Sequence, residues 1–161
     1  MSRQERFESF STPFSCAAVH DLLSDPTSEK LSLAEIRRLS PAALAYLGDA
    51  IYELHVRRRQ LFPPERLERY HQQVVARVRG SAQAKLLLVL LPHLNAEEQE
   101  VVRWGRNGCG RPPRHLSLAD YQNASGLETI LGYLYLANLE RLKHILALTD
   151  ILAETVAEME G

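Results

Sequence analysis

An all-α fold is predicted by three observations. Apolar residues recur at three- and four-residue spacing along most of the chain. No segment alternates apolar and polar residues between turn residues, as a strand with one exposed face would. Capping residues, prolines and glycines divide the pattern into helix-length segments. The 161 residues suit one domain with a sizeable core. We expect residues 1–30 to form a partly disordered arm, with at most a short helix near 17–23, and residues 31–161 to form the folded domain.

The ends of the helices follow from local signals. The start signals are a capping box of Ser32 with Glu35, Ser40 followed by Pro41, and the cap residues Asn95 and Ser117. The stop signals are Phe62-Pro63-Pro64, Gly80 and Pro92. We therefore expect helices over residues 32–39, 41–60, 64–79, 81–91, 96–104, 117–122 and 125–137, with a last helical stretch to about residue 159.

We expect the helix over residues 41–60 to be the one around which the chain is organised. Its apolar stripe is Leu44, Leu47, Ile51 and Leu54. Asp49 lies on nearly the opposite side, which also carries Tyr46 and Tyr52, so the helix should be packed on most of its circumference. Asp49 then faces a buried partner or the wall of a cleft. A structural hydrogen bond and a functional role remain equally open.

A second carboxylate, Glu128, also stands among apolar and small residues. Ser125 and Glu128 have the spacing of a capping box, which favours a structural role for Glu128. The alternative is a metal site, because paired acids on two packed helices suit Mg²⁺, which prefers oxygen ligands. Such ions stabilise the attacking and leaving oxygens of a phosphoryl transfer.

Charge is sorted along the chain although the net charge is only −1. Acids collect in residues 97–100 and 150–160, whereas residues 103–115 hold none. Residues 105–115 are rich in glycine and proline and are expected to be neither helix nor strand. Their arginines suit phosphate binding, and the alternative is a solvated loop. Further arginines, among them Arg57, Arg58, Arg77 and Arg79, precede this loop, and charge sorted in this way can give a neutral protein one basic face.

Several other kinds of protein are disfavoured. The longest apolar run, residues 86–91, is too short to cross a bilayer, and the N-terminus leads into no signal-peptide segment, so we expect a cytoplasmic protein without membrane association. Cys16 and Cys109 are far apart and the six histidines are scattered, which argues against zinc. No phosphate-binding glycine motif or nucleophile elbow is present.

Two stretches together resemble a known family. Residues 44–54, LAYLGDAIYEL, look like the signature helix of the ribonuclease III catalytic domain. Residues 124–136, ASGLETILGYLYL, look like its second metal-binding helix. With Trp104-Gly105-Arg106-Asn107 and Tyr121 between them, and no room for a double-stranded-RNA-binding domain, the chain is similar to the Mini-ribonuclease III branch of that family.

This resemblance implies an all-helical homodimer that cleaves double-stranded RNA with Mg²⁺ and leaves a 5′ phosphate and a 3′ hydroxyl. It implies that Asp49 and Glu128 hold the catalytic metal and its water, which favours the ligand role for Glu128. Larger relatives carry further acids at the positions of Ala45 and Ser125, so the number of metals stays open. The implied RNA-binding residues are Arg103, Arg106, Asn107, Arg111 and Arg114 in and beside the basic loop, together with Arg57 and Arg58 or with Arg77 and Arg79.

The implied biological role is maturation of the large-subunit (23S) ribosomal RNA precursor, with a ribosomal protein or particle as a further partner. Two alternatives remain open on the sequence. One is a non-catalytic, ribosome-associated RNA-binding module of the same fold. The other is a structural helical adaptor in which Asp49 is a hydrogen-bond acceptor in the core.

Overall fold

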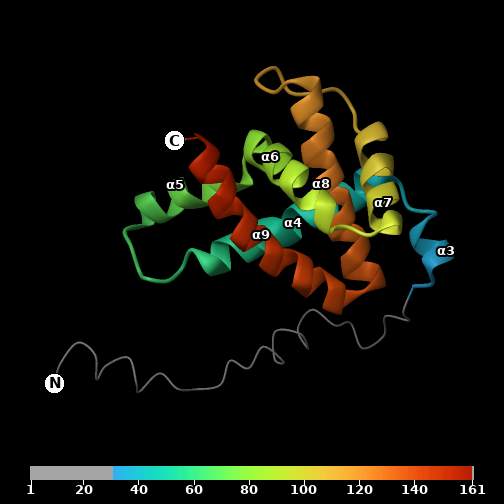
Figure 1. The fold of residues 1–161 in the computed structure, drawn as a ribbon, viewed down its shortest axis with the longest axis horizontal. Coiled ribbons are helices and arrows are strands. Elements are labelled where there is room, and N and C mark those ends of the chain that lie inside the picture. The colour runs from blue at the N-terminus through green and yellow to red at the C-terminus, as the bar shows by residue number, and fades with distance from the viewer. Residues whose placement is uncertain (1–30, 161) are drawn as a thin grey trace. The chain divides into compact units, whose positions relative to one another are not determined.

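The computed structural model describes residues 31–160, without the side chains of residues 158–160. The expected N-terminal arm and its short helix lie outside the described residues. Within the described part the regular elements are helices only, which confirms the all-α class (Figure 1). In chain order these are α3 (Leu33–Ile36), α4 (Pro41–Arg59), α5 (Leu67–Val78), α6 (Gly80–Leu90), the 3₁₀ turn η1 (Leu91–His93), α7 (Ala96–Asn107), α8 (Leu118–Ala137) and α9 (Leu139–Glu160).

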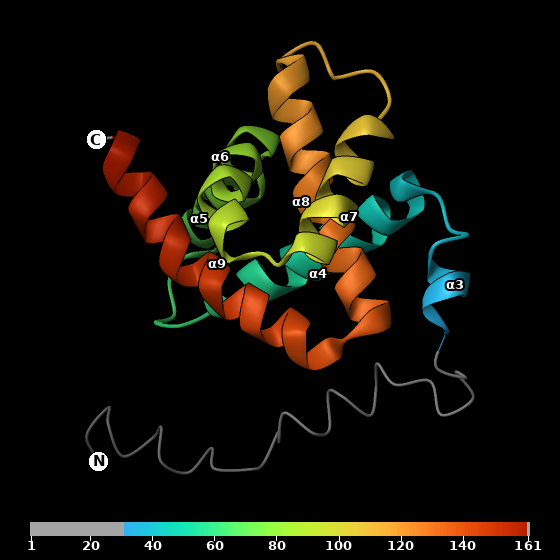
Figure 2. The same ribbon diagram turned by 45° about the vertical axis from the view of Figure 1, so that its right-hand side comes forward.

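Helix α8 lies at the centre of the described part, a place that we expected α4 to take. Helices α4, α6 and α7 pack around α8, and α9 lies across its C-terminal end (Figures 1 and 2). Residues 123–127 and 129–134 of α8 are all buried. Because these residues are apolar or small at almost every position, α8 can be enclosed on every side.

Helices α4 and α8 cross with their backbones in contact. A Cβ atom on Gly48 would collide with the carbonyl oxygen of Glu128, and one on Gly132 would collide with the carbonyl oxygen of Leu44. Glycine at both positions is therefore what permits this close approach. Gly48 therefore serves the contact between the two helices.

The packed face of α4 is a row at four-residue spacing, formed by Leu44, Gly48, Tyr52 and Val56. Our expected stripe is therefore wrong beyond Leu44, since Leu47 and Ile51 are only partly buried and Leu54 is 56% exposed. Gly48 accounts for the difference between the expected and the observed buried row. Helix α8 approaches α4 where the side chain is smallest, and the neighbouring residues of the same row are buried with it.

Several predicted helix ends are confirmed. Ser32 and Glu35 form a reciprocal capping box, and the Ser40 hydroxyl accepts from the N–H of Ala43 with Pro41 in the first turn. Asn95 caps α7 in the same way that Ser32 caps α3. These signals depend on contacts within three residues, so the sequence alone reveals them.

Three other expectations are wrong. Residues 105–107 belong to α7, because Gly105 allows that helix to pack on Thr129 of α8. Leu118–Ala137 form one continuous helix whose cap is Ser117, so Ser125 lies in mid-helix and caps nothing. Helix α5 begins at Leu67 and not at residue 64, with Arg66 as an extended residue before it.

Charged side chains fasten α9 to the other helices. Arg141 donates to Glu98 of α7 over 2.7 Å and to the carbonyl oxygen of His93 over 2.9 Å. Further along α9, Asp150 lies 3.1 Å from the His55 ring nitrogen and 3.0 Å from Nε of Arg59, both on α4.

None of the helices in residues 31–160 combines the length and the apolar composition that a membrane-spanning helix needs.

Candidate active site

A pocket of about 200 Å³ lies where α4, α8 and the residues after α7 meet. Asp49 and Glu128 both line it. The helix crossing brings them there, because Asp49 follows Gly48 and the backbone of Glu128 is what Gly48 touches. The remaining lining residues are Pro41, Ala42, Ala45, Tyr46, Gly105, Gly108, Cys109, Gly110, Tyr121 and Ser125.

Burial disfavours the ionised form of both carboxylates. Burial raises the pKa of Glu128 to about 8, the negative charge of Asp49 adds to that rise, and a hydrogen bond from Gln83 opposes it. Burial likewise raises the pKa of Asp49, with the charge of Glu53 adding and a hydrogen bond from Gln83 opposing. A bound cation would favour the ionised form of both groups.

Gln83 of α6 is a member of this site that our sequence reasoning missed. Its side chain is 2% exposed, and its Nε2 donates to the carbonyl oxygen of Val78 over 2.9 Å. The same nitrogen lies 3.5 Å from Oδ1 of Asp49. An uncharged amide among alanines and leucines was the one signal in the sequence, and it points to no particular partner.

The available donors suit a hard divalent cation. Among the described residues no group of three or more His, Cys, Asp or Glu side chains is placed to hold a metal ion. Asp49 and Glu128 supply carboxylate oxygens, and the lining holds no imidazole. The Cys109 thiol also lines the pocket, where its Sγ donates to the carbonyl oxygen of Arg106 over 3.1 Å. Mg²⁺ is usually bound by one or two carboxylates and keeps several of its waters, so this donor set fits it.

The positions at which larger relatives carry additional acids face the same pocket. Ala45 of α4 and Ser125 of α8 both line it. Ser125 is 5% exposed, and its carbonyl oxygen accepts from the hydroxyl of Thr129 over 2.6 Å. The pocket wall is therefore uncharged where two further carboxylates would stand.

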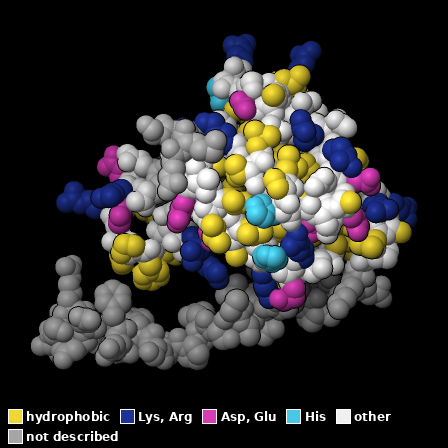
Figure 3. Space-filling model, viewed as in Figure 1, with side chains coloured by type: hydrophobic (Ala, Val, Ile, Leu, Met, Phe, Trp, Pro, Cys, Tyr) yellow, Lys and Arg dark blue, Asp and Glu magenta, His cyan; other side chains and the backbone are white. Residues whose placement is uncertain are grey.

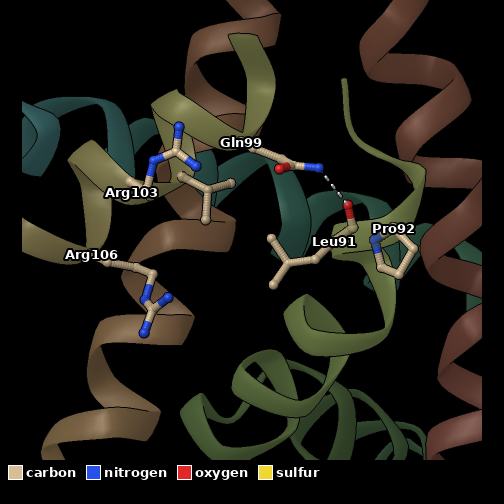
Figure 4. Close-up of a pocket in the computed structure, with 6 residues that line it drawn as sticks. Leu91, Pro92, Gln99, Arg103 and Arg106 are labelled. Atoms are coloured by element: carbon tan, nitrogen blue, oxygen red, sulfur yellow. Dashed lines mark hydrogen bonds between the residues drawn. The ribbon is translucent and has the colours of Figure 1, made fainter. Parts of the chain in front are cut away.

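Arg103 and Arg106 lie on α7 beside a second pocket, of about 340 Å³ (Figure 4). Leu91, Pro92, Gln99 and Val102 form the rest of its lining, and Gln99 donates to the carbonyl oxygen of Leu91 over 3.3 Å. Arg103 lies 3.5 Å from Glu100. The Nε of Arg106 is buried and has no hydrogen-bond partner in the described part of the chain.

The connection between α7 and α8 carries exposed arginines at the edge of the first pocket. Arg111 directly follows Gly110, which lines that pocket, and both Arg111 and Arg114 are exposed. Lys and Arg side chains project from the end of the molecule that this connection forms, at the top of Figure 3. Asn107 is exposed at the last position of α7.

The other predicted RNA-binding arginines differ in their surroundings. Arg57 pairs with Glu53 over 2.9 Å, Arg58 is exposed without an ion pair among the described residues, and Arg79 is exposed between α5 and α6. Arg77 is 25% exposed and lies 3.6 Å from Asp150 of α9. Since Asp150 engages Arg77, we leave that arginine out of the proposed RNA-binding set.

Comparison with known proteins identifies the family. The model of the Ribonuclease III domain matches residues 42–139, a span that includes Asp49 and Glu128. The chain belongs to the ribonuclease III family. A relative from Synechococcus sp. named Mini-ribonuclease 3 is 55% identical over 125 residues, which are 76% of this chain and 91% of the relative. One of the same name from Gloeobacter violaceus is 55% identical over 72% of this chain and 86% of its own length.

A solved structure agrees with this assignment. The crystal structure of a Fusobacterium nucleatum protein aligns with a TM-score of 0.65 and 30% identity, over 70% of this chain and 93% of that one. The ribonuclease III family member described here is thus an endoribonuclease with an all-α fold. Family membership favours the enzyme over the non-catalytic module and the helical adaptor that the sequence left open.

Proposed function

We propose that this endoribonuclease cleaves double-stranded RNA with Mg²⁺ held by Asp49 and Glu128, leaving a 5′ phosphate and a 3′ hydroxyl. The observation that carries the proposal is the meeting of these two carboxylates in one pocket. The exposed arginines that begin directly after the pocket wall support it. A duplex read by its shape and its phosphates requires such basic residues and no base-reading pocket.

Each group in the site has a distinct task. When bound, a divalent cation supplies activation of water and neutralisation of charge at the phosphate. Asp49 and Glu128 hold that ion from two helices whose spacing is fixed by the backbone contact at Gly48. Arg111 and Arg114 bind phosphates of the duplex at the edge of the pocket, with Arg103, Arg106 and Asn107 extending the contact along α7. Arg57, Arg58 and Arg79 bind more distant phosphates.

The active form is a homodimer in which each subunit cuts one strand. Support comes from α4, whose solvent side carries Tyr46 at 86% exposure and Leu54 at 56% exposure. Ala43 and Ala50 on the same side are also exposed. An apolar side of this kind on the helix that carries Asp49 is suited to packing on the same helix of a second copy.

The natural substrate is the 23S ribosomal RNA precursor in the cytoplasm, with a ribosomal protein or particle as a further partner. The resemblance to Mini-ribonuclease III supports this role. In vitro, a precursor fragment with its paired ends should be cut at fewer positions than an arbitrary duplex of equal length. Equal cutting of both RNAs would argue against the ribosomal role and leave the duplex activity standing.

The direct test is cleavage of a labelled RNA duplex with Mg²⁺ by the wild type, Asp49→Asn and Glu128→Gln. Both variants should lose at least about a hundredfold in rate and still bind the duplex, because the carboxylates hold the metal and not the RNA. Asp120→Asn is the control, because Asp120 lies on α8 outside the pocket. This variant should cleave the duplex at the wild-type rate. Wild-type rates in Asp49→Asn would refute the site.

A further inference from the structure

Gln83 occupies an unusual place for an amide side chain. It lies in the first turn of α6, which packs on α8, and it is 2% exposed. Its Nε2 lies 3.5 Å from Oδ1 of Asp49, and its side chain also hydrogen bonds to Glu128. Helices α4, α6 and α8 thus each bring a polar side chain to the same point.

The orientation of the amide group follows from its neighbours. The Val78 carbonyl oxygen, 2.9 Å away, accepts a hydrogen bond and so must face the amide nitrogen. The second hydrogen of that nitrogen is then available to Asp49 at 3.5 Å. A reversed amide would place its oxygen against the carbonyl oxygen and the carboxylate, which repel it.

This orientation leaves the amide oxygen without a donor. Oε1 of Gln83 is buried and has no hydrogen-bond partner in the described part of the chain. Buried acceptors in folded proteins nearly always have a partner, and an exception at a functional site commonly marks a place for a water or an ion. A hydrated cation beside the two carboxylates would bring O–H donors to this region.

We propose that Gln83 is a positioning residue of the cation site, whose Nε2 fixes Asp49 and whose Oε1 accepts a hydrogen bond from the water shell of the ion. This inference rests on the proposed function. It explains how a site without acids at Ala45 and Ser125 can hold a divalent cation: Asp49 and Glu128 balance its charge, and a neutral amide orders its waters.

The test measures binding of Mn²⁺ to the RNA-free protein by calorimetry and by electron paramagnetic resonance. Mn²⁺ is suited to the same oxygen donors as Mg²⁺. Gln83→Leu should weaken Mn²⁺ binding about tenfold, because a group that orders a metal's outer shell typically contributes that much. In duplex cleavage the same variant should need more Mg²⁺ for half-maximal rate and recover most of its rate at saturating Mg²⁺.

Gln99→Leu is the matched control. Gln99 is also a partly buried amide, and its nitrogen donates to the carbonyl oxygens of Leu91 and Leu94, but it lines the other pocket. Its replacement should leave Mn²⁺ affinity unchanged. An equal loss in both variants would mean that any disturbed amide weakens the site, and the proposal would be overturned.

Gln83→Met keeps the test decisive should Gln83→Leu fail to fold. Methionine is unbranched and of similar length but lacks the amide, so it should fill the same space and also weaken Mn²⁺ binding about tenfold. Wild-type affinity in either folded variant overturns the inference while the duplex activity of the wild type stands. A wild-type protein that neither binds Mn²⁺ nor cuts duplex overturns both proposals.

Discussion

Helices α4 and α8 are both rich in apolar and small residues, but they are buried to different extents. In α8, residues 123–127 and 129–134 are enclosed by other helices. In α4 a single row at four-residue spacing is enclosed, and Tyr46 and Leu54 remain exposed on another side. The apolar residues of α8 are thus buried within one chain, whereas those of α4 leave an exposed apolar side, which the proposed dimer would cover.

The largest expected effect comes from a substitution that disrupts the backbone contact between α4 and α8. Gly48→Ala places a methyl group against the carbonyl oxygen of Glu128 and should destabilise the fold by about 3 kcal/mol, since overpacked helices must separate. Urea unfolding followed by circular dichroism measures it. Gly110→Ala is the control, because a Cβ there meets nothing nearer than the Tyr121 hydroxyl at 4.0 Å. Equal stability of both variants would exclude backbone contact at Gly48.

A charge placed on the exposed apolar side of α4 tests whether that side forms the proposed dimer interface. Leu54→Asp should weaken the proposed dimer about a hundredfold, because each copy would bury a carboxylate in an apolar interface. Light scattering after size-exclusion chromatography over a concentration series reports this. Leu88→Asp on α6 is matched in exposure, 55% against 56%, and should leave the oligomeric state unchanged. A Leu54→Asp protein that stays dimeric would place the interface elsewhere.

An acid at Ser125 would make the α8 wall of the pocket resemble that of the larger relatives. Without metal, Ser125→Asp should lower the free energy of unfolding by about 1 kcal/mol, because a third buried carboxylate is added beside Asp49 and Glu128. Mg²⁺ should restore that loss and raise the melting temperature more than it does in the wild type. Thermal unfolding with and without Mg²⁺ separates the two outcomes, and a variant insensitive to Mg²⁺ would contradict an ion in this pocket.

The smallest expected effect concerns the polar end of α4. Burial lowers the pKa of His55 below its ordinary value near 6.5, while the charge and hydrogen bond of Asp150 oppose that shift. A lowered pKa in the folded state means that the unfolded chain binds the proton more tightly. The stability contributed by His55 is then complete above pH 6.5 and is lost as the pH falls through the folded-state pKa. Urea unfolding of His55→Gln against the wild type from pH 7.5 to 5 should show a shallower pH dependence in the variant.

The parts of the fold that the sequence predicts are those with local causes. Ser32, Ser40 and Asn95 cap helices through backbone N–H groups within three residues, and the structure agrees at each. The approach of Asp49 to Glu128 was expected from two motifs, and the two side chains do line one pocket. Their catalytic role remains a prediction.

The parts that escaped prediction depend on contacts between distant segments. Gly105 breaks a helix by intrinsic preference, yet packing on Thr129 keeps α7 continuous through it. Ser125 has the spacing of a cap, but the helix had already begun at Leu118. Gln83 carries no motif at all. It joins the site only because α6 packs beside α8, and no local pattern encodes that contact.

The backbone contact between α4 and α8 also bears on how this protein can change over generations. The spacing of α4 and α8 is set by main-chain atoms at Gly48 and Gly132, which side-chain substitutions at other positions do not remove. Leucines and isoleucines around the crossing can therefore be exchanged for one another while the gap between Asp49 and Glu128 stays constant. Core residues can thus change in sequence without changing the distance between these two carboxylates, whereas Gly48 and Gly132 cannot be replaced without moving the helices apart.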